Sequence, residues 1–271
     1  AERTRFLASL KTMLLTAIDG GVAKQNQIRR LNRFQYNNSV RDLFRLNRDV
    51  FALPEKLMTR QTIYLNTPKM PDHVNVRSLT LYPDAGLREV KAFPKDLRAS
   101  HGFDNQANQL TLSPLLLDAF LRLSVSIVES PDFNEDTVGI WSTFFERPAE
   151  DADVPTETSK RIKAFLTQAF RGPVERAVVD RYTAYALAKM KQELSFTDSM
   201  KKVASAALSS PMFLYRYSIN GDKSKPYVLA SNLSFFLWAS GPDDKLLRLA
   251  DSGELTKPEV LGKTIDHMLA D

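Results

Sequence analysis

Residues 31–46 read LNRFQYNNSVRDLFRL, and this stretch contains the clearest helix signal in the chain. Asn32 followed three residues later by Gln35 is a variant of the capping box, in which two side chains satisfy the first free amides of a helix. Behind this start, apolar side chains recur at positions i, i+4, i+7 and i+8, namely Tyr36, Val40, Leu43 and Phe44. This spacing predicts a helix over residues 33–46 that buries one face.

Two further helices are predicted in the first half of the chain. Residues 6–18 repeat apolar side chains at helical spacing before Gly20-Gly21, which predicts a buried face made of Phe6, Leu10, Met13, Leu14 and Ala17. Ser113-Pro114 is typical of a helix start, and Ser130-Pro131 ends the apolar pattern of Leu116, Phe120, Leu123 and Ile127.

The second half of the chain is predicted to be helical almost throughout. The expected helices run over 162–170 and 178–190, from a cap at Thr197 to Leu208, from Leu229 to Leu237, from Pro242 to Leu249, and from 256 to 268. The third of these should turn five side chains inward: Met200, Val203, Ala204, Ala207 and Leu208. The fold class is therefore predicted to be mainly α, with multi-helix orthogonal or bundle-like packing.

Residues 59–100 interrupt this pattern. Short apolar runs there are separated by four prolines, which disfavour a long helix and favour an irregular or β-containing insert. The acidic stretch 146–158 is the best candidate for a linker, so the predicted modules are 1–146 and 158–271. The alternative is one continuous helical domain that is cut short at its C-terminus.

Composition excludes several classes of site. The 271 residues include no cysteine, which excludes disulfides, thiolate metal sites and covalent C-x-x-C-H haem attachment within this sequence. No stretch approaches the roughly 18 consecutive apolar residues of a membrane span. The 37 Lys and Arg residues against 32 Asp and Glu residues give a net charge of +5, which favours an acidic partner.

The densest basic stretch runs from Arg29 to Arg48, and it provides the candidate interaction surface: Arg29, Arg30, Arg33, Arg41 and Arg45. Asp42 and Asp49 interrupt the stretch, so a solvated face with salt bridges is favoured. Nucleic-acid binding through these arginines is the alternative.

No complete catalytic or metal-binding constellation is present. The three histidines, His73, His101 and His267, are scattered, and residues 102–108 favour a polar turn over a calcium loop. The adjacent carboxylates Glu135/Asp136, Glu150/Asp151 and Asp243/Asp244 are better explained by helix starts and loops. Trp141, Trp238 and residues 235–238 are interpreted as core. We therefore predict no cofactor, no metal and no identified catalytic residue.

Three groups of motifs nevertheless resemble a known set of modules. The first group consists of Arg29–Leu43, Gly102–Asn105 and Leu112–Leu116. The second consists of Ala164–Val174 with Ser209–Arg216, and the third of Leu229–Trp238 with Pro242–Leu247. They resemble consecutive domain-of-unknown-function modules of large secreted, cytochrome c-like proteins of planctomycetes and related bacteria. Gln35 departs from the Glu that is usual in these modules, and the stretch from Val50 to Ser100 is reshaped.

The resemblance implies an extracytoplasmic (periplasmic or secreted) location and a link to c-type cytochrome electron transfer or polysaccharide breakdown. The leading hypothesis is a non-catalytic helical scaffold or interaction module, with any haem c on a partner or on another segment. The rival is an enzyme or binding protein for polysaccharides that uses separated carboxylates such as Asp104 and Asp118.

Overall fold

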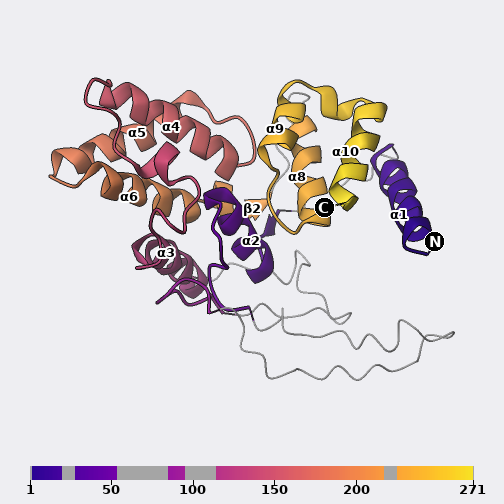
Figure 1. The fold of residues 1–271 in the computed structure, drawn as a ribbon, viewed down its shortest axis with the longest axis horizontal. Coiled ribbons are helices and arrows are strands. Elements are labelled where there is room, and N and C mark those ends of the chain that lie inside the picture. Colours follow the sequence, from indigo (N-terminus) through magenta and orange to yellow (C-terminus); the bar gives the residue numbers. More distant parts are fainter. Residues whose placement is uncertain (1, 20–27, 54–84, 95–113, 217–224, 271) are drawn as a thin grey trace.

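The computed structural model describes residues 2–19, 28–53, 85–94, 114–216 and 225–270, and these residues are mainly α-helical, as predicted (Figure 1). Their helices are α1 (Glu2–Asp19), α2 (Arg33–Phe44), α3 (Pro114–Glu129), α4 (Val154–Ala169), α5 (Arg176–Lys191), α6 (Phe196–Leu208), α7 (Pro211–Leu214), α8 (Lys225–Leu237), α9 (Asp244–Asp251) and α10 (Pro258–Ala270). A π-helical turn, η4 (Trp141–Phe145), and a 3-10 turn, η6 (Glu254–Thr256), accompany them. Strands β1 (Arg29–Arg30) and β2 (Tyr215–Arg216) pair antiparallel.

Helix α2 starts with the predicted capping box. The Asn32 side chain accepts from the amide of Gln35 at 2.8 Å, and the Gln35 side chain accepts from the amide of Asn32 at 3.4 Å. The helix ends at Phe44, two residues earlier than predicted. Arg45 is left-handed with φ 51°, and the amide of Leu46 bonds back to the carbonyl of Arg41, which closes the helix.

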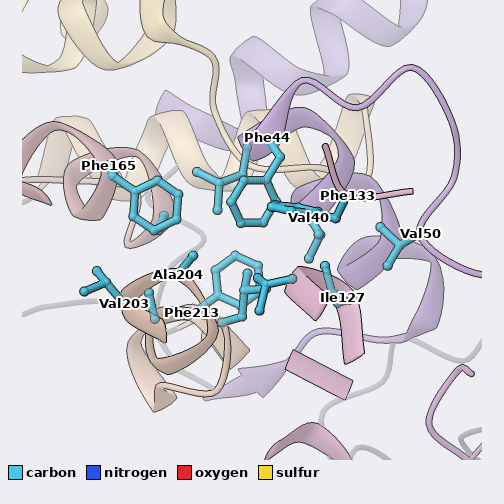
Figure 2. Packing of buried hydrophobic residues seen from close by; sticks show 14 of the residues in the cluster. Val40, Phe44, Val50, Ile127, Phe133, Phe165, Val203, Ala204 and Phe213 are labelled. Atoms are coloured by element: carbon cyan, nitrogen blue, oxygen red, sulfur yellow. The ribbon is translucent and has the colours of Figure 1, made fainter. Parts of the chain in front are cut away.

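The first hydrophobic core gathers side chains from α2 to α7 around α6 (Figure 2). The five residues of α6 predicted to face inward are fully buried. They meet α3, α4 and α5, and Figure 2 shows Val40 and Phe44 of α2 beside Ile127, Phe165 and Phe213. Because α2 has neighbours on several sides, it also buries polar residues: Gln35, Asn37, Asn38 and Ser39.

A second hydrophobic core joins α8, α9, η6 and α10, with α1 against α10. Figure 1 shows this group on the side of the molecule opposite α4 and α5. The predicted buried face of α1 is wrong in part, because Phe6 and Met13 are 66% and 68% exposed. Leu14, Leu15 and Ile18 of α1 pack against the second core, whereas Ala17 of the predicted face is exposed like Phe6 and Met13.

Several helix starts differ from the prediction; three of them are instructive. Ser195, not Thr197, caps α6, because its side chain accepts from the amide of Asp198 at 3.0 Å. Helix α8 begins at Lys225, four residues before the predicted start. Helix α9 begins after Asp243, whose carboxylate caps it by accepting from the amide of Leu246 at 2.7 Å.

Most of the predicted insert lies outside the described residues. Of residues 59–100, only 85–94 are described; they form no helix, and Gly86 makes an isolated bridge with Phe51. Helix α4 begins at Val154, inside the predicted linker, and Thr158 is fully buried there. Among the described helices none is both long and apolar enough to cross a membrane.

Candidate interaction cleft

The structure splits the predicted arginine surface into two groups. Arg29 and Arg30 lie on strand β1, and the Arg33 side chain donates to the carbonyl of Phe93 at 2.6 Å. Arg30 is only 1% exposed, so its place on an interaction surface is wrong. Its guanidinium lies 5.6 Å and 5.4 Å from the ring centres of Phe93 and Phe120, where cation–π attraction stabilises it within the core.

Arg41 and Arg45 instead line a cleft of about 1250 Å³. Its walls are the C-terminal half of α2, the turn η4, one face of α4 and the segment from Leu237 through the start of α9. The cleft therefore collects side chains that lie about 200 residues apart in the sequence. Its charged residues are Arg41, Asp42, Arg45, Glu157, Lys160, Arg161, Arg171, Asp243, Asp244, Lys245 and Arg248.

On the α2 wall, both arginines contact carboxylates. A guanidinium nitrogen of Arg41 lies 3.0 Å from Asp42, and another lies 3.8 Å from the nearly buried Asp49. Arg45 reaches across the cleft, and its Nη2 lies 2.9 Å from Oδ2 of Asp244 at the start of α9. Both side chains of the Arg45–Asp244 pair are more than half exposed, so this pair adds little to stability.

On the α4 wall, Glu157 holds two cations. Its carboxylate lies 3.0 Å from Nε of Arg161 and 3.5 Å from Nζ of Lys160. The hydrogen bond from Arg161 is the main reason that the pKa of Glu157 is lowered. Glu157 is therefore ionised at neutral pH, which suits an ion pair and not a proton donor.

The α9 wall carries cations without such partners. Lys245 and Arg248 are exposed, and neither forms an ion pair with any residue that the structure describes. Asp243, beside them, is engaged as the cap of α9. The cleft as a whole has seven cationic side chains against four carboxylates, so its field is positive.

Arg171 lies at the floor of the cleft and is structural. It is 8% exposed and donates to the carbonyls of Met212, Phe213 and Tyr215 at 2.7, 3.0 and 2.7 Å. These bonds tie the end of α4 to α7 and β2. Near it, the side chain of Gln168 donates to the carbonyl of Pro242 at 2.7 Å, which fixes the segment before α9.

The other predicted constellations do not assemble into a site. His73, His101, residues 102–108 and Asp104 lie outside the described residues, and His267 is exposed on α10. The carboxylate pairs at 135–136 and 150–151 are exposed, and Asp118 pairs with Arg122 at 2.7 Å on the surface of α3. Across the described ranges, no three His, Cys, Asp or Glu residues converge to hold a metal.

The predicted aromatic core residues are buried only in part. Phe235 is 4% exposed, but Phe236, its neighbour, is 62% exposed. Trp141 packs against the first core and Trp238 against the second, where its indole nitrogen donates to the carbonyl of Met268 at 3.3 Å. Trp238 also lines the cleft, a role that the sequence pattern did not indicate.

Sequence reasoning missed four cations of the cleft: Lys160, Arg161, Lys245 and Arg248. They come from two helices and form no local charge pattern that indicates a binding surface, so no local signal could have found them. Arg171 was missed as well, although the sequence Arg171-Gly172-Pro173 at a helix end indicates an unusual backbone, and Arg171 has φ 62°.

Comparison with known proteins gives three matches to family models, all of proteins of unknown function. Residues 29–56 and 76–130 match the family PSD3 (DUF1587), residues 157–217 match PSD5 (DUF1595), and residues 225–271 match PSD4 (DUF1592). No curated protein matches the chain, and no solved structure matches it. The chain thus carries three consecutive modules whose families have no assigned function.

Proposed function

We propose that this chain is a non-catalytic helical interaction module, and that the cleft between α2, α4 and α9 is its docking surface. One observation carries the proposal: the cleft is lined by all three matched modules. Arg41 and Arg45 lie in the first match, Lys160 and Arg161 in the second, and Lys245 in the third. The surface exists only where the three modules pack together, which gives a physical reason for their joint occurrence.

The state of the carboxylates in the cleft supports docking over catalysis. Asp42 and Asp244 are held by arginines, Asp243 caps a helix, and Glu157 is kept ionised by Arg161. A carboxyl group that acts as a general acid at neutral pH needs a raised pKa, and the shift at Glu157 has the opposite direction. These groups are arranged to balance positive charge.

The proposal includes a cellular location and a class of partner protein. The resemblance of the sequence motifs to modules of secreted proteins makes an extracytoplasmic location the first to test, and a c-type cytochrome the first partner. Any haem c would be on that partner or on another segment, because this sequence has no cysteine for covalent attachment.

The test uses a substitution that fills the cleft without changing its charge. Ala164 is an exposed residue of α4 that lines the cleft, so Ala164→Trp fills it. Ala184→Trp, on the exposed face of α5 outside the cleft, is the matched control. Proteins of the source organism that bind the wild-type chain are identified, purified and measured again by calorimetry.

A purified partner that binds the wild type and the Ala184→Trp variant equally, and the Ala164→Trp variant at least about tenfold more weakly, supports the proposal. Equal binding to all three folded chains overturns the assignment of the cleft. Turnover of a substrate by the purified wild-type chain alone overturns the non-catalytic role.

A further inference from the structure

We infer that the cleft binds a peptide segment rich in Asp and Glu, an inference that rests on the proposed function. The first observation behind it is the exposure of the cations in the cleft. Lys160 and Arg45 have side chains that are 77% and 65% exposed, and Lys245 and Arg248 are exposed as well. These four surround one cleft, so a ligand in it can contact them together.

One carboxylate of the chain itself binds a cation of the cleft in the way that a ligand carboxylate could. Oδ2 of Asp244, at the start of α9, lies 2.9 Å from Nη2 of Arg45 on α2. The pair is well exposed and water screens it, so a carboxylate from a partner can replace Asp244 at little energetic cost. Arg45 then gains the partner's carboxylate while Asp244 stays at the N-terminal end of α9, where negative charge is favourable.

Two buried hydroxyls, one on the α2 wall and one on the segment before α9, point to a ligand that accepts hydrogen bonds. Ser39 and Ser240 line the cleft and are 6% and 2% exposed. The Oγ atom of each has no hydrogen-bond partner among the described residues. Buried hydroxyls of this kind are uncommon in folded proteins, and a carboxylate would supply the acceptor that they lack once the serine side chains turn toward the cleft.

The distribution of charge favours a peptide over a nucleic acid. Asp42, Glu157 and Asp243 are interspersed among the cations, and phosphates fixed at regular intervals along a backbone would meet these carboxylates, whereas carboxylates on flexible Asp and Glu side chains can turn toward the cations. Between the charges lie apolar side chains, including Leu43, Phe144 and Leu237. A peptide can match this mixture, because its carboxylates meet the cations while its other side chains cover the apolar wall.

The probe for the test is a fluorescent polyglutamate peptide, measured by anisotropy against the full chain. Polyglutamine of the same length and a single-stranded oligonucleotide of the same charge are the comparison ligands. The test variant is the double substitution Arg45→Gln and Arg248→Gln. Its control is the double substitution Arg122→Gln and Arg176→Gln on α3 and α5, both exposed and outside the cleft.

We expect the cleft double variant to weaken polyglutamate binding by about tenfold or more, and the control variant by much less. Asp244→Asn should strengthen binding by about two- to fivefold, because it frees Arg45. Raising the ionic strength from about 0.05 to about 0.5 M should weaken binding in all chains, and least in the cleft variant, which keeps fewer cations.

The inference is overturned if the oligonucleotide binds more tightly than polyglutamate, if both double variants lose binding equally, or if Asp244→Asn weakens it. The proposed function has a separate failure. If Ala164→Trp blocks the natural partner but polyglutamate does not bind, the cleft is a docking surface for another chemistry. If Ala164→Trp leaves the natural partner bound, the docking surface itself is wrong.

Discussion

Tyr36 joins helix α2 to the centre of the first core. Its ring centre lies 5.7 Å from those of Phe93, Phe120 and Phe213, and 6.3 Å from that of Phe51. Edge-to-face and tilted pairs of this kind add to the free energy gained by burial. The hydroxyl of Tyr36 is buried without a hydrogen-bond partner among the described residues, and this burial raises its pKa.

Because an unsatisfied buried hydroxyl is costly, Tyr36→Phe should stabilise the protein. We expect the free energy of unfolding to rise by about 1 kcal/mol, as measured by urea denaturation. Tyr185→Phe, at a 39% exposed position of α5, should change it by less than about 0.5 kcal/mol. A loss of stability in Tyr36→Phe would mean that the hydroxyl is hydrogen-bonded in solution.

Asp132 connects two loops through its carboxylate. It accepts from Nε of Arg88 at 2.7 Å, from the backbone amide of Arg88 at 3.0 Å and from Arg48 at 3.2 Å. The side-chain hydrogen bond from Arg88 is the largest cause of the lowered pKa of Asp132, followed by the backbone bond. The folded protein therefore binds the proton of this group less tightly than the unfolded chain.

A lowered pKa stabilises the folded state above the ordinary value of 3.8, and this contribution is lost as the pH falls through the folded pKa. Asp132→Asn should therefore destabilise the protein at neutral pH, and its difference from the wild type should shrink below pH 3.8. Urea denaturation across this range measures the effect. The control is Asp118→Asn, which breaks an exposed ion pair with Arg122 on α3. If the difference in unfolding free energy between Asp132→Asn and the wild type did not change with pH, the interpretation would be refuted.

Helix α6 shows which features of an element its own sequence can predict. Its inward face was predicted in full, because a period of 3.6 residues places these side chains on one side whatever they pack against. The N-cap of α6 was not predicted correctly, because serine and threonine are both preferred N-cap residues and the sequence offers Ser195 and Thr197. Thr197 instead donates to the carbonyl of Phe145 at 2.9 Å, a contact 52 residues away that no local pattern reveals.

The cap of α6 gives a prediction at this scale. Ser195→Ala removes the acceptor of the Asp198 amide and should lower the free energy of unfolding by about 1 kcal/mol. Ser126→Ala, inside α3, loses only a bond from its hydroxyl to the carbonyl of Leu123 and should be close to neutral. Equal effects of the two substitutions in thermal or urea denaturation would show that Ser195 is not the cap.

At the scale of the molecule, burial depends on neighbours that the sequence pattern does not name. Arg30 and Arg45 belong to one basic stretch, yet the first is enclosed by Phe93 and Phe120 and the second crosses the cleft to Asp244. The apolar pattern of α1 predicted its helix but not its exposed Phe6. The cleft could not be predicted for the same reason, because its walls come together only in the folded chain.

The two hydrophobic cores differ in size, and polar contacts contribute to the joint between them. Among the described residues, 35 buried hydrophobic residues form the first core and eight form the second. Helix α8 bridges them through Phe235, and the guanidinium of Arg216 lies 4.5 Å from that ring and donates to Asn232 at 3.0 Å. Burial in this joint lowers the pKa of Arg216 to about 10, so Arg216 still carries its charge at neutral pH.

A small core joined in this way should open before the large one. The backbone amides of α9 and α10 are therefore expected to exchange with deuterium faster than those of α6. The local unfolding that exposes α9 and α10 costs less free energy than the unfolding that exposes α6. Arg216→Ala removes the cation above Phe235 and the bond to Asn232, so it should speed exchange in α8, α9 and α10 and leave α6 unchanged. Arg176→Ala, whose side chain is 93% exposed on α5, should change neither group. Hydrogen-exchange mass spectrometry resolves these peptides, and equal acceleration of α6 and α10 in Arg216→Ala would show that the two cores unfold as one unit.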